Sequence, residues 1–183
     1  LIPYHEHNAE SMRPAIMARL THGETIALVS DAGTPLISDP GYKLVRKTIA
    51  SGIHVSALPG PCAAIMALTL SGLPSDRFTF IGFLPSKRLA RQKKLATLVD
   101  WDTTIVFFEA ARRLSECLQD MLEIFGNRNV SIARELTKIH EEIIRGRLKE
   151  IIINYDDQNS LKGELTIVLG PPPKSSTIFS EEF

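Results

Sequence analysis

Apolar and polar positions follow two periods along the first part of the chain, one helical and one strand-like, with glycine and proline between them. Asn8 and Asp39 are typical N-cap residues, and Pro40 is favoured at a first helical position. The short apolar runs between the helical stretches are typical of buried parallel strands. The elements expected are helices over 9–22, 40–51 and 61–71 and strands over 25–29 and 53–58. Short connections in this order predict a parallel, right-handed α/β unit.

The pattern beyond Leu73-Pro74-Ser75-Asp76 predicts a second α/β domain. Its expected elements are strands over 78–83, 103–108, 130–134, 141–147 and 165–169 and helices over 85–99, 110–125 and 148–154. Residues 141–147 also fit an irregular hairpin arm. A helix follows them on a short connection, so we expect strands of mixed direction. The predicted organisation is a domain at 1–73, a domain at 77–170 and a linker or tail at 171–183 that begins with three prolines.

The composition of the chain argues against several classes of function. The 183 residues include 21 basic and 21 acidic side chains, so no global field attracts nucleic acid or membrane, and any nucleic-acid contact requires a local patch. Cys62 and Cys117 form no CxxC motif, and the His5-Glu6-His7 run lacks a third ligand, so no zinc or other metal site is expected. No apolar run reaches the roughly 20 residues of a membrane span, and no signal peptide is visible. We expect a cytoplasmic protein without a membrane partner.

Two glycine- and proline-rich loops are the strongest functional signal. Residues 29–41 read V-S-D-A-G-T-P-L-I-S-D-P-G and residues 58–64 read L-P-G-P-C-A-A, each between a predicted strand and a predicted helix. In α/β sheets, ligands bind outside the carboxyl ends of the strands. The Asp31 carboxylate repels phosphate and suits a ribose hydroxyl, an amine or a cation, and neither GxGxxG nor GxxxxGK[ST] occurs. The alternative is that the first loop is only two turns and a helix cap.

Six ordered segments carry a family resemblance. They read S-D-A-G-T-P-L-I-S-D-P-G, L-P-G-P-C-A-A, G-L-P-S-D-R-F-x-F-x-G-F-L-P, F-F-E-A-A-R-R-L, A-R-E-L-T-K and K-G-E-L-T-I-V. Over residues 1–170 the chain resembles the RsmI family, the ribosomal RNA small-subunit methyltransferases I of the tetrapyrrole methylase superfamily. The resemblance implies an α/β fold with two domains of the class III SAM methyltransferase type. The first strand of the family's N-terminal domain, with its donor-binding turn, is expected before Leu1 and is missing from this chain.

The resemblance also implies an activity. It is S-adenosylmethionine-dependent methylation of the ribose 2′-oxygen of a cytidine in the decoding region of 16S ribosomal RNA. The implied partners are small-subunit rRNA or the assembled 30S subunit, and a second copy of the chain in a homodimer. Two alternatives remain open. One is a methyltransferase of the same superfamily acting on a tetrapyrrole or other small substrate, and the other is a catalytically silent fragment that binds RNA or a partner protein.

Site residues follow from the loops and the resemblance together. The cofactor-binding residues expected are Ser30, Asp31, Ala32, Gly33, Thr34, Pro61, Cys62, Ala63, Phe108 and Gly163. The segments around 108–110, 134–136 and 163–165 are expected to line the donor cleft. Glu109 and Glu135 are the expected catalytic carboxylates. Their alternative roles are an N-cap for Glu109 and an ion pair with Arg134 for Glu135.

One basic block stands out. The RNA-binding residues expected are Arg77, Lys87, Arg88, Arg91, Lys93, Lys94, Arg112 and Arg113, and no acidic residue occurs between positions 77 and 94. A helix face that is merely solvated is the alternative interpretation.

Overall fold

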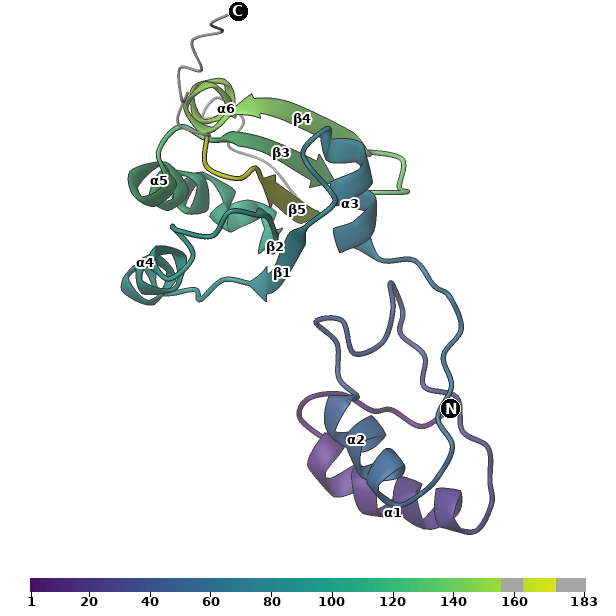
Figure 1. Ribbon diagram of the computed structural model, residues 1–183. Coiled ribbons are helices and arrows are strands. Elements are labelled where there is room, and N and C mark those ends of the chain that lie inside the picture. The colour runs from purple at the N-terminus through teal and green to yellow at the C-terminus, as the bar shows by residue number, and fades with distance from the viewer. Residues whose placement is uncertain (156–162, 174–183) are drawn as a thin grey trace, which may run out of the picture. The chain divides into compact units, whose positions relative to one another are not determined.

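The computed structural model describes residues 1–155 and 163–173, and the chain forms two compact units, Leu1–Cys62 and Ala63–Phe183 (Figure 1). Each unit is described by itself. The boundary between the units comes before the helix at 63–71, whereas the sequence placed the domain boundary after that helix. Residues 174–183 of the expected tail lie outside the described residues.

The first unit contains two helices, α1 (Ala9–Thr21) and α2 (Tyr42–Ala50). Ile16 and Met17 of α1 and Leu44 of α2 are buried together and form its small core. The predicted start of the second helix at Asp39 is wrong. Gly41 is the N-cap, and the Asp39 carboxylate instead accepts a hydrogen bond from the Ser30 hydroxyl at 2.5 Å.

The two predicted strands of this unit are also wrong. Residues 25–29 and 53–58 belong to no strand, and the apolar side chains Val29 and Leu58 are 70% and 89% exposed. A strand requires a neighbour to satisfy its backbone groups. Neither segment pairs with a strand within the described residues of this unit, so the apolar pattern alone does not produce a sheet.

The second unit is built on a five-stranded sheet with the order β1-β2-β5-β3-β4 (Figure 1). The strands are β1 (Phe78–Phe83), β2 (Thr104–Ala110), β3 (Asn129–Arg134), β4 (Glu142–Arg147) and β5 (Glu164–Leu169). β1 and β2 are parallel and the other three pairs are antiparallel, which confirms the predicted mixed sheet. The register shifts at a bulge between Phe80 and Gly82.

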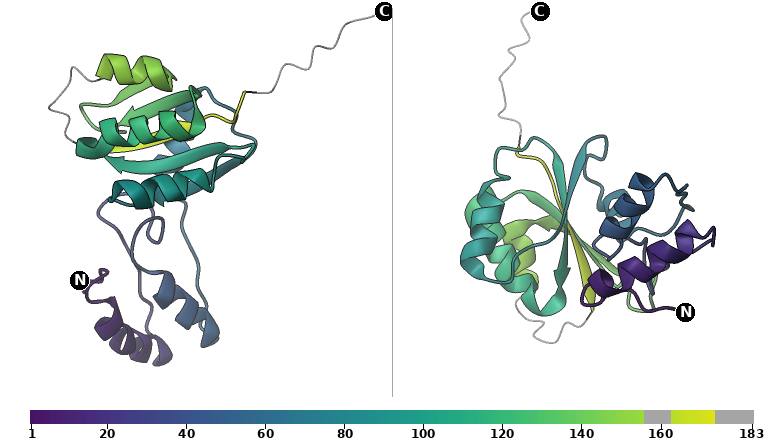
Figure 2. Two further views of the ribbon diagram at one scale, coloured as in Figure 1. Left: turned by 90° about the vertical axis from the view of Figure 1, so that its left-hand side faces the viewer. Right: turned by 90° about the horizontal axis from the view of Figure 1, so that it is seen from below.

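Helices cover both faces of this sheet (Figures 1 and 2). One face carries α4 (Arg88–Ala96), α5 (Leu114–Phe125) and α6 (Leu148–Tyr155), and the other carries α3 (Ala63–Ser71). A short 3₁₀ turn, η1 (Ala111–Arg113), precedes α5. Phe107 and Ile167 of the sheet and Leu118 and Met121 of α5 are almost fully buried between the layers. Burial of this apolar core stabilises the α/β arrangement by roughly 1.5–3 kcal/mol per large side chain.

A long-range contact attaches α3 to the sheet. Arg145 of β4 donates two hydrogen bonds to the Leu70 carbonyl, from Nε at 2.9 Å and from Nη2 at 2.6 Å. The last carbonyls of a helix lack partners within the helix, and a cation there also complements the helix dipole. Arg145 therefore satisfies the end of α3 from 75 residues away in the chain.

Candidate functional site

The two glycine- and proline-rich loops of the first unit lie side by side. The Thr34 hydroxyl donates a hydrogen bond to the Pro61 carbonyl at 2.8 Å, although the two residues are 27 positions apart. A Cβ at Gly60 would lie 3.2 Å from Thr34 Oγ1, and one at Gly33 would lie 4.0 Å from the Pro61 carbonyl oxygen. The two loops therefore share one surface within this unit, although neither of them follows a strand as the sequence analysis expected.

The first loop has a strained backbone. The Ile37 amide donates to the Thr34 carbonyl at 3.3 Å, and Leu36, the third residue of this turn, has φ +75°. A positive φ at that position is typical of a type II turn, where glycine is favoured. Ser38 also has a positive φ, of +60°. Non-glycine residues in this region cost about 1–2 kcal/mol each and concentrate at functional sites.

Gly41 makes the close packing of this loop possible. Its φ is +136°, and a Cβ there would lie 2.8 Å from the side-chain carbons of both Leu28 and Leu36. Any other residue at position 41 would have to displace these two leucine side chains and would also adopt an unfavourable positive φ. The packing of the loop therefore favours a glycine that does not belong to the turn itself.

The loops present oxygen atoms and backbone groups rather than positive charge. Residues 24–41 contain no lysine, arginine or histidine. Asp31, Ala32 and Gly33 are exposed. The Ser30 hydroxyl lies 2.9 Å from the Ala32 carbonyl oxygen and also binds Asp39, so it orders the turn from within. Cys62 is half-buried at the end of the second loop, and Ala63 is the first residue of α3 in the other unit.

A second group of predicted residues meets at one edge of the sheet. The register places Ala110 of β2 opposite Glu164 of β5, and Arg134 of β3 opposite Leu165. The carboxyl ends of β2 and β3 and the amino end of β5 therefore converge, which brings together the three segments around 108–110, 134–136 and 163–165. Phe108 stacks edge-on against Phe80 and Phe83 there, with ring centroids 4.8 and 5.6 Å apart.

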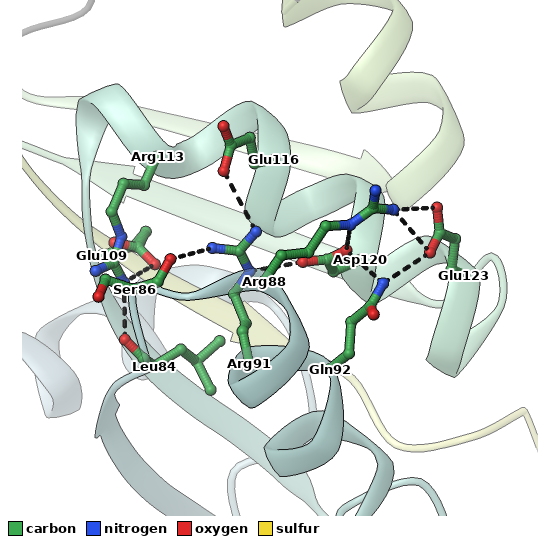
Figure 3. Close-up of polar contacts among 10 residues, drawn as sticks. All are labelled: Leu84, Ser86, Arg88, Arg91, Gln92, Glu109, Arg113, Glu116, Asp120 and Glu123. Atoms are coloured by element: carbon green, nitrogen blue, oxygen red, sulfur yellow. Dashed lines mark hydrogen bonds and ion pairs between the residues drawn. The ribbon is translucent and has the colours of Figure 1, made fainter.

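Glu109 lies inside the protein. Its side chain is fully buried, Oε1 accepts the Ala110 amide at 2.7 Å and Oε2 accepts Arg113 Nη2 at 2.8 Å (Figure 3). Arg113 Nη2 also donates to the Leu84 carbonyl at 2.8 Å. Glu109 does not cap the following helix, since the N-cap residue of η1 is Ala110. Its carboxylate joins β2 to the segment after β1 through Arg113.

Glu135 lies at the same edge, with its side chain 17% exposed. Oε1 accepts the Glu164 amide at 2.9 Å and Lys138 Nζ at 3.1 Å. The hydrogen bond from the Glu164 amide, followed by that from Lys138, lowers the pKa of the Glu135 carboxyl below its ordinary value. Glu135 forms an ion pair with Lys138, and Arg134, the partner considered as an alternative from the sequence, lies 3.4 Å from Glu142. The carboxylate is thus held ionised in a fixed orientation.

The basic block divides into buried and exposed residues. Arg91 is fully buried, and its Nε donates to Asp120 Oδ2 at 2.6 Å. Arg88 donates to Asp120 Oδ1 at 3.0 Å and to Glu123 at 3.0 Å (Figure 3). Arg88 is nevertheless 62% exposed, so Arg91 alone is buried. Arg113 is half-buried, and the exposed members besides Arg88 are Arg77, Lys87, Lys93, Lys94 and Arg112. Arg77 is 3.9 Å from Asp76 and 3.8 Å from Asp102.

The acidic stripe on α5 was missed by the sequence interpretation. Glu116, Asp120 and Glu123 follow the i, i+4, i+7 spacing of a single helix face. Arg88, Arg91 and Gln92, at i, i+3 and i+4, share one face of the preceding helix α4. The complementary charges are visible in the sequence, but recognising them as partners requires knowing that two helices separated by a strand pack together.

Comparison with known proteins decides the family. The family model of the Tetrapyrrole (Corrin/Porphyrin) Methylases matches residues 3–152. The chain belongs to this family. Among solved structures, the chain is similar to the methyltransferase CobJ, with a TM-score of 0.62 and 17% identity over 87% of this chain and 70% of that one. The cobalt precorrin-4 methyltransferase CbiF gives a TM-score of 0.61 and 18% identity over 88% and 70%. These likenesses confirm the α/β fold class.

Closer relatives come from curated sequences. The chain is 49% identical over 171 residues to the ribosomal RNA small subunit methyltransferase I of Xylella fastidiosa, covering 92% of this chain and 63% of the relative. It is 48% identical to the protein of that name from Halalkalibacterium halodurans, covering 92% and 58%. The resemblance found in the six motifs is thereby confirmed. The tetrapyrrole methylase chain spans about three-fifths of the length of these relatives.

In the described part of the chain, no helix has the length and apolar character needed to cross a membrane. Within residues 1–155 and 163–173, no three His, Cys, Asp or Glu side chains group as metal ligands.

Proposed function

We propose that the chain belongs to an S-adenosylmethionine-dependent enzyme that methylates the ribose 2′-oxygen of a cytidine in the decoding region of 16S rRNA. The observation that carries the proposal is the joining of the two loops through Thr34 and Pro61. It creates a surface of backbone groups with one exposed carboxylate. The relatives named as ribosomal RNA small subunit methyltransferase I support the choice of substrate.

The loop surface suits a cationic methyl donor. S-adenosylmethionine, when bound, supplies an electrophilic methyl group on a positively charged sulfur. The absence of basic residues from 24–41, together with the exposed carboxylate of Asp31, favours such a cation over a phosphate. Asp31 is suited to bind an amine or ribose hydroxyl of the donor, while exposed backbone at Ala32 and Gly33 allows close approach. A solved neighbour, uroporphyrin-III C-methyltransferase of Thermus thermophilus, is complexed with S-adenyl homocysteine.

The acceptor hydroxyl loses a proton as its oxygen forms the new bond to carbon and the bond between carbon and sulfur breaks. Glu135 is the stronger candidate to accept that proton, since its side chain is partly exposed while that of Glu109 is fully buried against Arg113. The lowered pKa of Glu135 makes it a weak base. Positioning of donor and acceptor therefore supplies most of the acceleration.

Calorimetric titration with S-adenosylhomocysteine tests the donor site. We expect micromolar binding by the protein and about tenfold weaker binding by Asp31→Ala, with an unchanged melting temperature. Unchanged affinity in Asp31→Ala would place the donor elsewhere. Absence of binding by the unsubstituted protein would leave a silent RNA- or partner-binding role as the surviving alternative.

Substrate choice has its own test. Methylation of small-subunit rRNA, as free RNA or in the assembled 30S subunit, is the expected activity, and methyl transfer to a tetrapyrrole instead would contradict it. We also propose a cytoplasmic location, because ribosomes are the proposed substrate. We further propose a homodimer, which sedimentation equilibrium would test directly.

A further inference from the structure

Helix α4 has two basic faces with different surroundings. Arg88, Arg91 and Gln92 point toward α5, and three lysines of the same segment remain exposed. The exposed lysines are Lys87, Lys93 and Lys94. A run that reads as one basic block in the sequence is therefore two groups in the structure, one that binds the protein and one that faces outward.

The inner group is fixed by a single carboxylate. Asp120 accepts hydrogen bonds from Arg91 Nε at 2.6 Å, Arg88 Nε at 3.0 Å and Gln92 Nε2 at 2.9 Å (Figure 3). Its side chain is fully buried. Burial alone would raise the pKa of Asp120, yet the hydrogen bonds from Arg91 and Arg88 outweigh it and lower the pKa below its ordinary value. The charges of this pair stay in place at neutral pH.

The flanking carboxylates complete the attachment. Glu116 lies 3.4 Å from Arg91 Nη2, and Glu123 accepts Arg88 and Gln92 at 3.0 and 3.1 Å. Further along α4, Leu95 is buried in the apolar core. The first half of the helix is thus held by ion pairs and the second half by apolar packing. These contacts on the inner side of α4 therefore fix the direction in which its outer face points.

The outer group has no acidic neighbour to neutralise it. Among the described residues, Lys87, Lys93 and Lys94 form no ion pair, and residues 77–99 contain no aspartate or glutamate. Lys87 and Lys94 are seven positions apart, which corresponds to two helical turns or about 10 Å. Ala90 lies between them on the same face and leaves space for a ligand to approach. This spacing fits a polyanion with regularly spaced charges.

We propose that the outer face of α4 binds the phosphate backbone of the RNA substrate through Lys87, Lys93 and Lys94. The buried Arg91 orients the helix and does not contact phosphate, and the guanidinium of the more exposed Arg88 is engaged by Asp120 and Glu123. The partner class rests on the proposed function, whereas the division of the block rests on the geometry. Lysines act as point charges toward phosphates, so this face positions the RNA and does not read its sequence.

Salt-dependent binding of a decoding-region transcript tests the proposal. The variant carries Lys87→Ala, Lys93→Ala and Lys94→Ala together. The matched control carries Lys43→Ala, Lys47→Ala and Lys149→Ala, three exposed lysines elsewhere, so both variants lose the same charge. We expect the first variant to bind RNA about 10- to 100-fold more weakly at 100 mM salt. Each lost phosphate contact should reduce the slope of log affinity against log salt by about 0.7–0.9.

Equal losses in the two triple variants, or an unchanged salt slope in the first, would overturn the proposal. S-adenosylhomocysteine binding, measured on the same samples, separates this outcome from failure of the proposed function. If donor binding is intact and only the α4 lysines prove irrelevant, the docking face alone is wrong. If the unsubstituted protein binds neither the donor nor the transcript, the proposed function itself fails.

Discussion

The carboxylate of Glu135 lies over the α-carbon of Gly163 and occupies the space that a side chain at position 163 would need. A Cβ there would come within 2.8 Å of Glu135 Cγ and 2.7 Å of its Cδ. Both residues also have a positive φ, of +112° at Gly163 and +47° at Glu135, and the former favours glycine. The Glu135 amide donates to the Glu164 carbonyl at 3.1 Å, so the two segments are joined in both directions. A glycine thus determines where a candidate catalytic carboxylate is held.

Replacing Gly163 with alanine should displace Glu135. We expect a loss of about 2–4 kcal/mol in the free energy of unfolding, since the positive φ and the overlap with Glu135 both oppose the new methyl group. Gly126→Ala is the matched control, because Gly126 has φ +71° and nothing within 4 Å of its Cβ. It should cost only about 1 kcal/mol. Equal denaturation midpoints for the two variants would contradict this account.

The hydrogen bond between Thr34 and Pro61 should contribute to donor binding. We expect Thr34→Val to bind S-adenosylhomocysteine about three- to tenfold more weakly, and Thr34→Ser to restore most of the affinity. Gly60→Ala should act in the same direction, because its Cβ would press on Thr34 Oγ1 at 3.2 Å. Amide exchange in residues 30–38 should rise in the valine variant. Identical affinities for valine and serine at position 34 would rule out a role for the hydroxyl.

Asp120→Asn should destabilise the protein strongly. The substitution removes the buried partner of the Arg91 guanidinium and leaves it only the exposed Glu116 carboxylate at 3.4 Å, and breaking a buried ion pair costs about 3–5 kcal/mol. Glu123→Gln on the same helix, at a half-exposed carboxylate, should have little effect. Urea denaturation measures both. A stable Asp120→Asn protein would show that the apolar residues of α4 are sufficient to hold the helix.

The ionisation of Asp120 should make the free energy of unfolding depend on pH. The pKa of Asp120 is lower in the folded protein than in the unfolded chain. Its contribution is therefore complete above the unfolded value of about 3.9 and is lost as pH falls through the folded value. The difference in unfolding free energy between the protein and Asp120→Asn should shrink below about pH 4. A difference that grows with acidification would have the wrong sign for an ionised Asp120.

The two cysteines should differ in reactivity. Burial, followed by the nearby charge of Glu109, raises the pKa of the Cys117 thiol to about 12, and the side chain is fully buried. The thiolate is the reactive form, so Cys117 should resist iodoacetamide at pH 8 in the folded protein. Half-buried Cys62 should be alkylated first. Mass spectrometry of the modified peptides identifies which residue has reacted.

Local periodicity predicted the elements of the second unit well and those of the first unit poorly. The strand at 78–83 is found with its predicted bounds, and the remaining strands differ by one or two residues. In the first unit the apolar runs at 25–29 and 53–58 have strand-like composition. Composition does not provide the neighbour with which a strand pairs.

For the candidate site too, the sequence predicted local motifs but not the contacts between distant residues. The loop motifs predicted that residues near 34 and 61 share a surface, but the hydrogen bond between them depends on the fold. The basic block predicted positive charge, but it did not predict which side chains face α5 and which face solvent. Arg91 is buried because Asp120, 29 positions away, lies opposite it, and such a pairing becomes visible only when the two helices are packed together.

The two hydrogen bonds from Arg145 to Leu70 bear on how the chain could be divided in the laboratory. They hold α3 to the sheet through β4 at the far end of the sequence, so this helix depends on residues that follow it. A protease that cuts between residues 52 and 62 would release a fragment that keeps α3. A cut placed after residue 72 would separate the helix from the Arg145 side chain that completes it and would uncover the apolar surface beneath. For expression of the second unit alone, Ala63 is therefore a sounder first residue than Arg77.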